Sequence, residues 1–288
     1  MSKKDLLVNI KKLREITGVG FNDCKMALDE TEGDIEKSIE FLRKKGIAKA
    51  SKKMSRTASE GLALVKINEG QISLIEINSE TDFVAKNQDF VNFCKELLEI
   101  SFATKGDLKK LNETKMANGI LVKDNLVNLI AKIGEKITLR RANFFDNLNG
   151  TNFSYVHSAI EKGIGKIISV VKIDGISKGK NEDIGNKIAM HIAASNPLAV
   201  DKDSIDKTIV DKELEIIKAE ITNSGKPVEM AEKISKGKIT KFLNDNSLLN
   251  QLWIMDPKKK VSDILKENSI DKPLKILNFV RYKVGEGV

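Results

Sequence analysis

The chain has 288 residues and a net charge of +8, and 31% of its residues are charged. Lysine supplies most of the positive charge and aromatic residues make up only 5%, whereas nucleic-acid binders more often combine clustered arginine with interleaved aromatics. The composition therefore argues against nucleic acid as a partner, and it leaves an acidic protein surface or a transient ribosome contact as alternatives.

Cysteine usage and hydropathy indicate where the protein works. Cys24 and Cys94 are far apart and outside any C-x-x-C motif, which argues for a reducing compartment without disulfides or structural zinc. The first ten residues contain no long apolar run, so we expect no signal peptide. No stretch is apolar for long enough to cross a bilayer. We expect a cytoplasmic protein that does not contact a membrane.

Residues 4–46 predict a compact unit of three helices. Apolar side chains recur at helical spacing in the first and third of them. Asp34 is the expected N-cap of the third helix, and Gly46 is expected at its C-terminal end. The basic run 44–56 follows, and we interpret it as a basic linker in preference to the alternative, an RNA contact. Residues 1–55 are assigned to this N-terminal helical domain.

The next part of the chain contains two similar series of elements. Residues 61–67 and 72–77 alternate as in a β-hairpin, and helices from about 88 and around 125–133 and a strand over 136–145 follow. The second series has strands over 154–160 and 165–173, a helix over 181–195 and a strand over 275–285. The series predict two related α+β subdomains, 56–145, and 146–199 with 249–288.

Residues 200–248 interrupt the second series. They contain helical patterns over about 207–222 and 226–243, joined by the turn residues 223–225. Two long amphipathic helices with a short connection predict an antiparallel helical hairpin, and its polar composition predicts that it protrudes. The fold class is therefore α+β, with an N-terminal three-helix domain and a protruding hairpin.

Side chains suited to chemistry are scarce. The two histidines, His157 and His191, are not in a metal-binding spacing. His191 is expected to be packed on an apolar helix face, and His157, on a predicted strand, is the better candidate for a surface contact. The glycines around Gly163 lack the spacing of a P-loop. We therefore expect no enzyme active site, no cofactor and no direct nucleotide binding.

The segment 78–87 places an acid and a phenyl ring side by side between the predicted hairpin and the next helix. Ser79-x-x-Asp82 matches a capping box, and Phe83 and Val84 then anchor the helix in the core. The alternative is that Asp82 and Phe83 project from a rigid base toward another protein. The spacing by itself favours the capping alternative.

Seven motifs resemble the elongation factor Ts family in identity and order, across nearly the whole chain. They are LREITGVGFNDCKMAL, EGDIEKSIEFLRKKG, TDFVAKN, IAMHIAASNP, SGKP, IMDP and RYKVGEG. The resemblance implies a guanine-nucleotide exchange factor for elongation factor Tu, the GTPase that it would bind in the GDP-bound and nucleotide-free states. It also implies that the N-terminal domain has a ubiquitin-associated-like fold.

The resemblance also implies roles for single residues. Thr81, Asp82, Phe83 and Val84 match the segment that dislodges magnesium from the GTPase, with the Phe ring inserted between two helices and the Asp helping to move them. The residues that match other contacts to the partner are Arg14, Phe21 and Asn22 for the GTPase domain, and His157, Ile254 and Met255 for the C-terminal β-barrel region. Asn22 departs from the methionine common in the family.

Two alternatives stay open. The predicted hairpin matches the coiled-coil module of the family, and whether it joins two copies of the chain in a homodimer is undecided. The second alternative is an RNA- or ribosome-associated accessory protein, which the net charge and the basic run 44–56 favour. RNA binding falls steeply with ionic strength, so a salt titration separates it from exchange activity.

Overall fold

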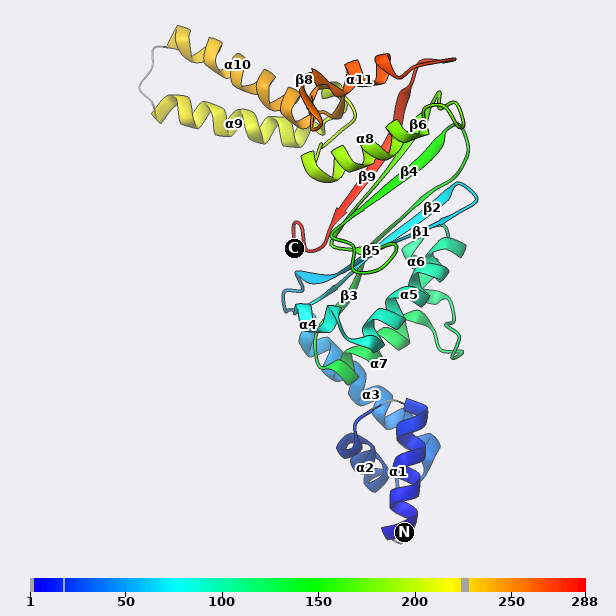
Figure 1. The fold of residues 1–288 in the computed structure, drawn as a ribbon. Helices are drawn as coiled ribbons and strands as arrows, with labels where there is room; N and C mark the ends of the chain where they lie inside the picture. Colours follow the sequence, from blue (N-terminus) through cyan, green and yellow to red (C-terminus); the bar gives the residue numbers. More distant parts are fainter. Residues whose placement is uncertain (1–2, 18, 224–227) are drawn as a thin grey trace.

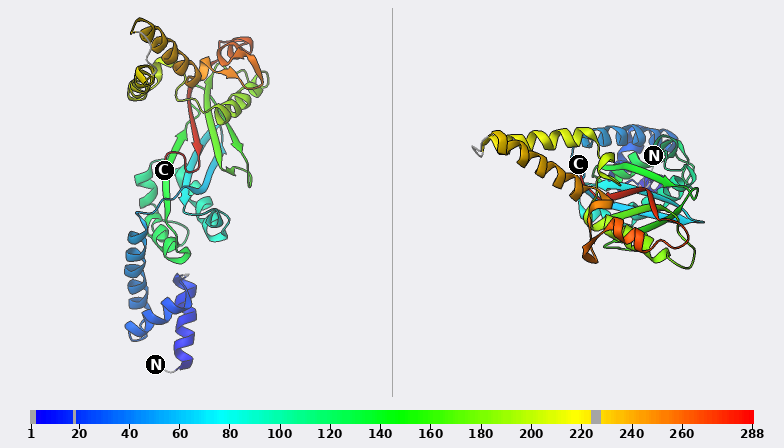
Figure 2. Two further views of the ribbon diagram at one scale, coloured as in Figure 1. Left: turned by 90° about the vertical axis from the view of Figure 1, so that its left-hand side faces the viewer. Right: turned by 90° about the horizontal axis from the view of Figure 1, so that it is seen from above.

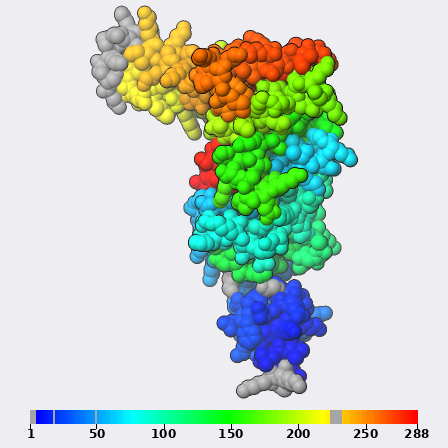
Figure 3. Space-filling model, in the orientation of Figure 1, coloured from blue at the N-terminus to red at the C-terminus, as the bar shows by residue number. Residues whose placement is uncertain are grey.

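The structure, a computed structural model, describes residues 3–17, 19–223 and 228–288. The molecule is elongated, with the N-terminal helices at one end and a projecting pair of helices at the other (Figure 1). Helices and antiparallel sheets both contribute, which confirms the predicted α+β class. The space-filling view shows the N-terminal unit as a separate knob below the main body (Figure 3).

Three helices form the N-terminal unit, as predicted: α1 (Lys3–Thr17), α2 (Phe21–Glu30) and α3 (Ile35–Lys53). Their buried apolar residues meet in one small core that includes Leu13, Cys24 and Leu28. The Asp34 carboxylate accepts the backbone N–H of Lys37, which confirms Asp34 as the N-cap of α3.

The expected end of the third helix at Gly46 is wrong, because α3 continues to Lys53. Gly46 instead faces α7 (Val122–Ile133), where a Cβ atom would lie 3.5 Å from the Cβ of Ala131. Ala50, one turn further along, is buried in the same core as α7. Most of the basic run 44–56 is therefore helix. Its small residues Gly46 and Ala50 let α3 pack closely against the main body.

The first sheet contains β1 (Glu60–Asn68), β2 (Gln71–Ser79), β3 (Ile137–Phe145) and β5 (Ile164–Gly165), in the order β3-β2-β1-β5. Side chains alternate across it: Leu62 and Leu64 pack on one face, and Ala63 and Val65 on the other. The helices that cover the first face are α4 (Asp82–Ala85), α5 (Gln88–Ala103), α6 (Leu108–Glu113) and α7.

The second sheet contains β4 (Thr151–His157), β6 (Ile167–Asp174) and β9 (Lys275–Lys283), in the order β4-β6-β9. Ile168 and Val170 pack against the first sheet, whereas Val171 and Ile173 pack against α8 (Glu182–Ser195) and α11 (Val261–Glu267). The main body therefore has four layers, helices on each outer side of two stacked sheets (Figure 1).

The two sheets share a strand arrangement. In each, two antiparallel strands are followed by helices and then by a returning strand that pairs with the second of the two. Each of these late pairings contains a register shift, next to Ile77 in one and next to Ile173 in the other. The division into two related subdomains stays a prediction, and the common arrangement is consistent with it.

The interrupting segment contains the two predicted helices, α9 (Lys207–Asn223) and α10 (Val228–Asn246), which extend away from the main body (Figure 2). Residues 224–227, which include most of the predicted turn, lie outside the described residues. Short elements connect the pair to the second sheet: η1 (Lys202–Ser204), η2 (Leu248–Asn250), β7 (Leu252–Trp253) and β8 (Asp256–Lys260).

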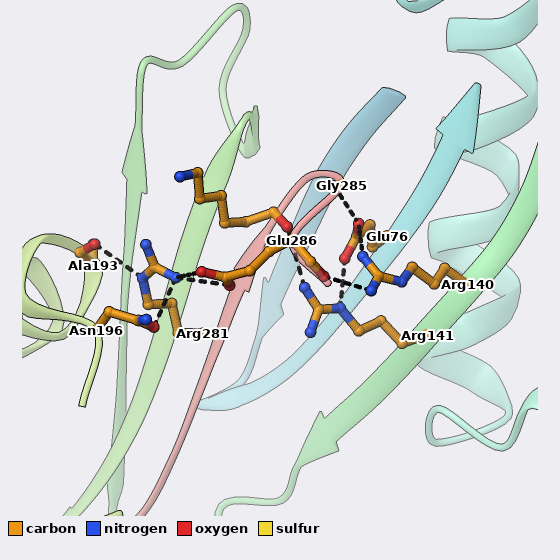
Figure 4. A network of polar contacts seen from close by, with 9 residues as sticks. Glu76, Arg140, Arg141, Ala193, Asn196, Arg281, Gly285 and Glu286 are labelled. Carbon is orange, nitrogen blue, oxygen red and sulfur yellow. Dashed lines mark hydrogen bonds and ion pairs between the residues drawn. The ribbon is translucent and has the colours of Figure 1, made fainter. Parts of the chain in front are cut away.

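A buried carboxylate joins the two sheets (Figure 4). Glu76 of β2 is fully buried and accepts hydrogen bonds from Arg140, Arg141 and the backbone N–H of Gly285. Both arginines reach it because Arg140 is the extra residue of a β-bulge: Arg141 pairs with Glu76, and the residue before Arg140 pairs with Ile77. A buried charge is tolerated only when it is paired in this way.

Candidate functional site

The candidate site is the exposed segment between β2 and α5, residues 80–87, which we call the tip. The short helix α4 begins after Thr81, and Val84 and Ala85 on its inner side are buried in the core below the first sheet. Phe83 points the other way, with 78% of its surface exposed. Burying a phenylalanine is worth roughly 1.5–3 kcal/mol, so this side chain contributes little of that to the fold. The expectation that Phe83 anchors the core is wrong, whereas Val84 does so.

The capping box is also wrong. The Ser79 hydroxyl donates to the carbonyl of Thr81, 3.0 Å away, and Thr81 is the N-cap residue of α4. The following helix, α5, is capped by Asn87, whose side-chain oxygen accepts the backbone N–H groups of Asp89 and Phe90. The spacing from Ser79 to Asp82 misled because four residues of helix intervene before α5 begins.

Asp82 and Phe83 share one cationic neighbour. The Lys86 ammonium lies 2.7 Å from an oxygen of Asp82, one helical turn away, and 5.9 Å from the centre of the Phe83 ring. The hydrogen bond from Lys86 lowers the pKa of Asp82. The tip therefore presents an ionised carboxylate and an uncovered ring beside each other.

Two glutamates that the sequence did not single out hold the base of the tip. The carboxylate of Glu135 accepts both the backbone N–H and the hydroxyl of Thr81, at 3.0 and 2.8 Å. Glu80 accepts the backbone N–H of Lys136 and pairs with Arg56. No local pattern could reveal these contacts, because Glu80 follows β2 and Glu135 precedes β3, more than fifty residues apart in the sequence.

Arg14 and Phe21, expected to bind the partner, line one groove of about 490 Å³ on the N-terminal unit. Its lining is apolar at Leu7 and basic at Lys11 and Lys132, and Lys132 comes from α7 of the main body. Asn22 is exposed beside Phe21 and does not line this groove. The structure brings two of the three residues together.

The remaining expected contacts are exposed on the second half of the main body. His157 ends β4 and lies 3.3 Å from the hydroxyl of Tyr155. Ile254 and Met255 form the turn between β7 and β8, with 38% and 46% of their surfaces exposed. The sequence indicated Ile254 and Met255 only through the family resemblance, whereas the predicted strand had already marked His157 as a candidate for a surface contact.

His191 is buried, as predicted, and it supports the turn at Ile254. Its Nδ1 accepts the backbone N–H of Ile254, 3.4 Å away, so its Nε2 carries the proton and donates to Gln251 at 3.0 Å. The ring also stacks on Trp253, with 5.2 Å between the ring centres. Burial lowers the pKa of His191, and the contact with Gln251 offsets this only in part.

Intrachain partners occupy much of the basic run 44–56. Lys44 pairs with Glu40, Lys45 with Asp23 and Arg56 with Glu80. These charges are less available to an RNA phosphate than a free basic segment would be. Within residues 3–17, 19–223 and 228–288, no group of three or more metal-ligating side chains occurs. In the same ranges, no helix is long and apolar enough to span a bilayer.

Comparison with known proteins gives one consistent result. The family described as Elongation factor TS matches residues 80–286, a range that begins at the tip. Curated proteins named Elongation factor Ts are similar over 97% of the chain: one from Maricaulis maris is 42% identical, with 91% of its length covered, and one from Clostridium kluyveri is 42% identical, with 92% covered. One from Rickettsia typhi is 40% identical, with 91% covered.

Proposed function

This chain belongs to the elongation factor Ts family, and from that premise we propose that it promotes the release of GDP from elongation factor Tu during translation elongation. It binds the GDP-bound and nucleotide-free states of that GTPase and has no chemical active site of its own. GTP can then enter the emptied site. The chain acts as a nucleotide exchange factor.

The proposed mechanism uses differential binding. A factor that binds the empty GTPase more tightly than the GDP form must weaken GDP binding by the same ratio. Phe83 makes contacts that exist only when two helices of the GTPase have separated, and Asp82 beside it helps to displace them. Because bound Mg²⁺ neutralises phosphate charge, its loss leaves the charge of GDP poorly compensated.

One observation carries this proposal: Phe83 is 78% exposed on a tip whose other apolar residues are buried. Because the Phe83 ring is not buried within this chain, burying it against a partner can stabilise the complex. A rigid support limits the conformational entropy that is lost on binding. Thr81 fixes the start of the tip, and Val84 anchors it.

Further contacts extend the interface. We propose that Arg14, Phe21 and Asn22 contact the GTPase domain, and that His157, Ile254 and Met255 contact the β-barrel region of the partner. This division of labour follows the proposed domains: 1–55, 56–145, 146–199 with 249–288, and the hairpin 200–248. Binding at two separate surfaces of one partner raises the overall affinity through effective concentration.

The test is stopped-flow release of a fluorescent GDP from elongation factor Tu at increasing concentrations of this chain. We expect the release rate to rise and then saturate. Phe83→Ala should lower the saturating rate by about 10- to 100-fold, the factor that corresponds to losing the burial of one phenyl ring. Circular dichroism should show an unchanged fold, because the ring is exposed.

Leu148→Ala is the matched control, since Leu148 is also exposed, at 63%, but lies in the loop between β3 and β4. With this variant, GDP should leave elongation factor Tu at the rate seen with the unmutated chain. If Phe83→Ala also gave this rate, the tip would not drive exchange. A steep loss of partner binding with salt, together with RNA binding, would instead favour the ribosome-associated alternative.

The α9–α10 hairpin supports a second candidate, self-association. An apolar groove of about 530 Å³ runs along it, lined by Leu214, Ile221 and Ile239 together with Lys218 and Lys236. Leu214 lines this groove from α9 and Ile239 lines it from α10. We propose that a second copy covers this surface. Analytical ultracentrifugation should give a dimer that Leu214→Glu dissociates, and a monomer at all concentrations would refute the proposed self-association.

A further inference from the structure

Glu80 and Glu135 make reciprocal contacts at the end of a strand pair. The β2–β3 ladder ends with Ser79 opposite Ile137. The next residues in the same register are Glu80 opposite Lys136, and then Thr81 opposite Glu135. Each glutamate side chain accepts the backbone N–H of the residue that follows the other glutamate: Lys136 donates to Glu80 at 2.6 Å, and Thr81 donates to Glu135 at 3.0 Å.

These contacts replace ladder bonds that the backbone can no longer make. Past Ser79 the chain must leave the sheet, because α4 begins directly after Thr81. On the opposite strand, the chain enters from Gly134, which has a left-handed conformation. The part-buried N–H groups of Thr81 and Lys136 would lose their partners at this divergence, and leaving such donors unpaired costs free energy. The two carboxylates satisfy them with charge-assisted hydrogen bonds.

The same junction also holds the end of α3. The Lys136 ammonium donates to the carbonyls of Met54 and Arg56, each at 2.8 Å, and the Arg56 guanidinium pairs with Glu80. Burial by itself raises the pKa of Glu80, but the hydrogen bonds from Lys136 and Arg56 outweigh it and lower that pKa. The base of the tip is therefore attached both to β3 and to the long helix that leads to the N-terminal unit.

We infer that Glu135 and Glu80 are positioning residues that hold the tip at Phe83 in the orientation required for nucleotide exchange. Glu135 fixes Thr81, the N-cap residue two positions before Phe83, through two hydrogen bonds. Glu80 fixes the opposite strand and α3. Since the inference concerns the orientation of the tip during exchange, it rests on the proposed function.

The first test examines the free protein and needs no partner. Amide hydrogen exchange of Thr81, followed by NMR, should be roughly tenfold faster or more in Glu135→Ala, the factor expected for losing a hydrogen bond to a charged group. Amides of Leu64 and Ile75, within the first sheet, should keep their protection and so report an intact core. Unchanged exchange at Thr81 would overturn the inference.

The second test separates geometry from charge in the GDP-release assay. In Glu135→Gln, the amide oxygen can accept the Thr81 N–H and the amide nitrogen can donate to the Thr81 hydroxyl, so most activity should remain. Glu135→Asp keeps the charge but is shorter by one methylene, so it should behave like Glu135→Ala. We expect the alanine variant to lower the saturating release rate by about tenfold, with a half-saturating concentration changed by less than about twofold.

A double-mutant cycle shows whether Glu135 acts through Phe83. Phe83→Ala with Glu135→Ala should release GDP within about twofold of the rate of Phe83→Ala alone, because a misplaced tip without its ring has nothing more to lose. Additive losses, or activity retained by the aspartate and not the glutamine variant, would overturn the inference. Glu113→Ala, at an exposed position of α6, is the control.

The two hypotheses can fail separately. If Phe83→Ala releases GDP normally, the proposed role of the tip is wrong, whatever the amide exchange of Thr81 shows. If Phe83→Ala slows release while Glu135→Ala leaves both release and amide exchange unchanged, exchange at the tip stands and only the positioning role is refuted.

Discussion

The guanidinium of Arg141 lies over the ring of Tyr282, 4.2 Å from the ring centre. Arg141 comes from β3 and Tyr282 from β9, so the contact joins the two stacked sheets. The same arginine also binds the buried carboxylate of Glu76. A cation between a carboxylate and an aromatic face is satisfied on two sides, and the sheet interface therefore tolerates its charge.

Alkaline pH should weaken this interface through Tyr282. Burial raises the pKa of Tyr282 from 10.0 to about 12. The folded state thus favours the neutral phenol, so the contribution is complete below pH 10 and is lost as pH rises from 10 to 12. The loss should reach roughly 2–3 kcal/mol. Urea unfolding across this range should show the loss. Lysines titrate in the same range, so the contribution of Tyr282 is the difference between the unmutated chain and Tyr282→Phe, which lacks the phenol.

Asp82→Ala should slow GDP release from elongation factor Tu, though less than Phe83→Ala does. The Asp82 side chain is half-exposed and pairs with Lys86 one turn away, so its removal should leave the free energy of unfolding nearly unchanged. Asp183→Ala removes a similar pair with Lys187 on α8 and serves as the control for exchange. Normal release by Asp82→Ala would limit the working part of the tip to the ring.

Two helical glycines should respond oppositely to alanine. A Cβ on Gly185 would lie 2.3 Å from the Phe153 ring, so Gly185→Ala must push α8 off the second sheet and should destabilise by about 1–3 kcal/mol. Gly237 in α10 has nothing within 4 Å of such an atom. Gly237→Ala should stabilise by about 0.5–1 kcal/mol, because glycine disfavours helix. Thermal unfolding of both variants measures the contrast, and equal effects would contradict the packing.

Acid should destabilise the turn at Ile254 through His191. The pKa of His191 is lowered by burial from its ordinary 6.5, so its contribution is complete above pH 6.5 and is lost as pH falls through the lowered pKa. Protonation also removes the acceptor of the Ile254 N–H. The slope cannot exceed about 1.4 kcal/mol per pH unit for one proton. Urea unfolding of His157→Gln, which leaves His191 as the only histidine, measures it. A flat profile would contradict the prediction.

The elements could be predicted from the sequence to a large extent. The hairpin of β1 and β2, the strand β3 and the helices α9 and α10 lie close to where alternation and helical periodicity placed them. Periodicity works because each of these elements buries one face, and burial of one face is recorded in neighbouring residues. The predicted end of α3 was wrong. Gly46 has the sequence pattern of a helix terminus, and only the packing of Ala131 from another helix against it shows why a small residue lies at this position inside α3.

For the candidate site, the sequence by itself determined the composition of the tip and the family to which the chain belongs. The tertiary structure decided which side chains are available there. It buried Val84, left Phe83 uncovered and assigned Ser79 to a bond with Thr81 in place of a helix cap. It also brought Glu135 to Thr81 across two strands. Such contacts depend on residues distant in the chain, so no local spacing encodes them, and only the assembled sheet fixes the direction of the tip.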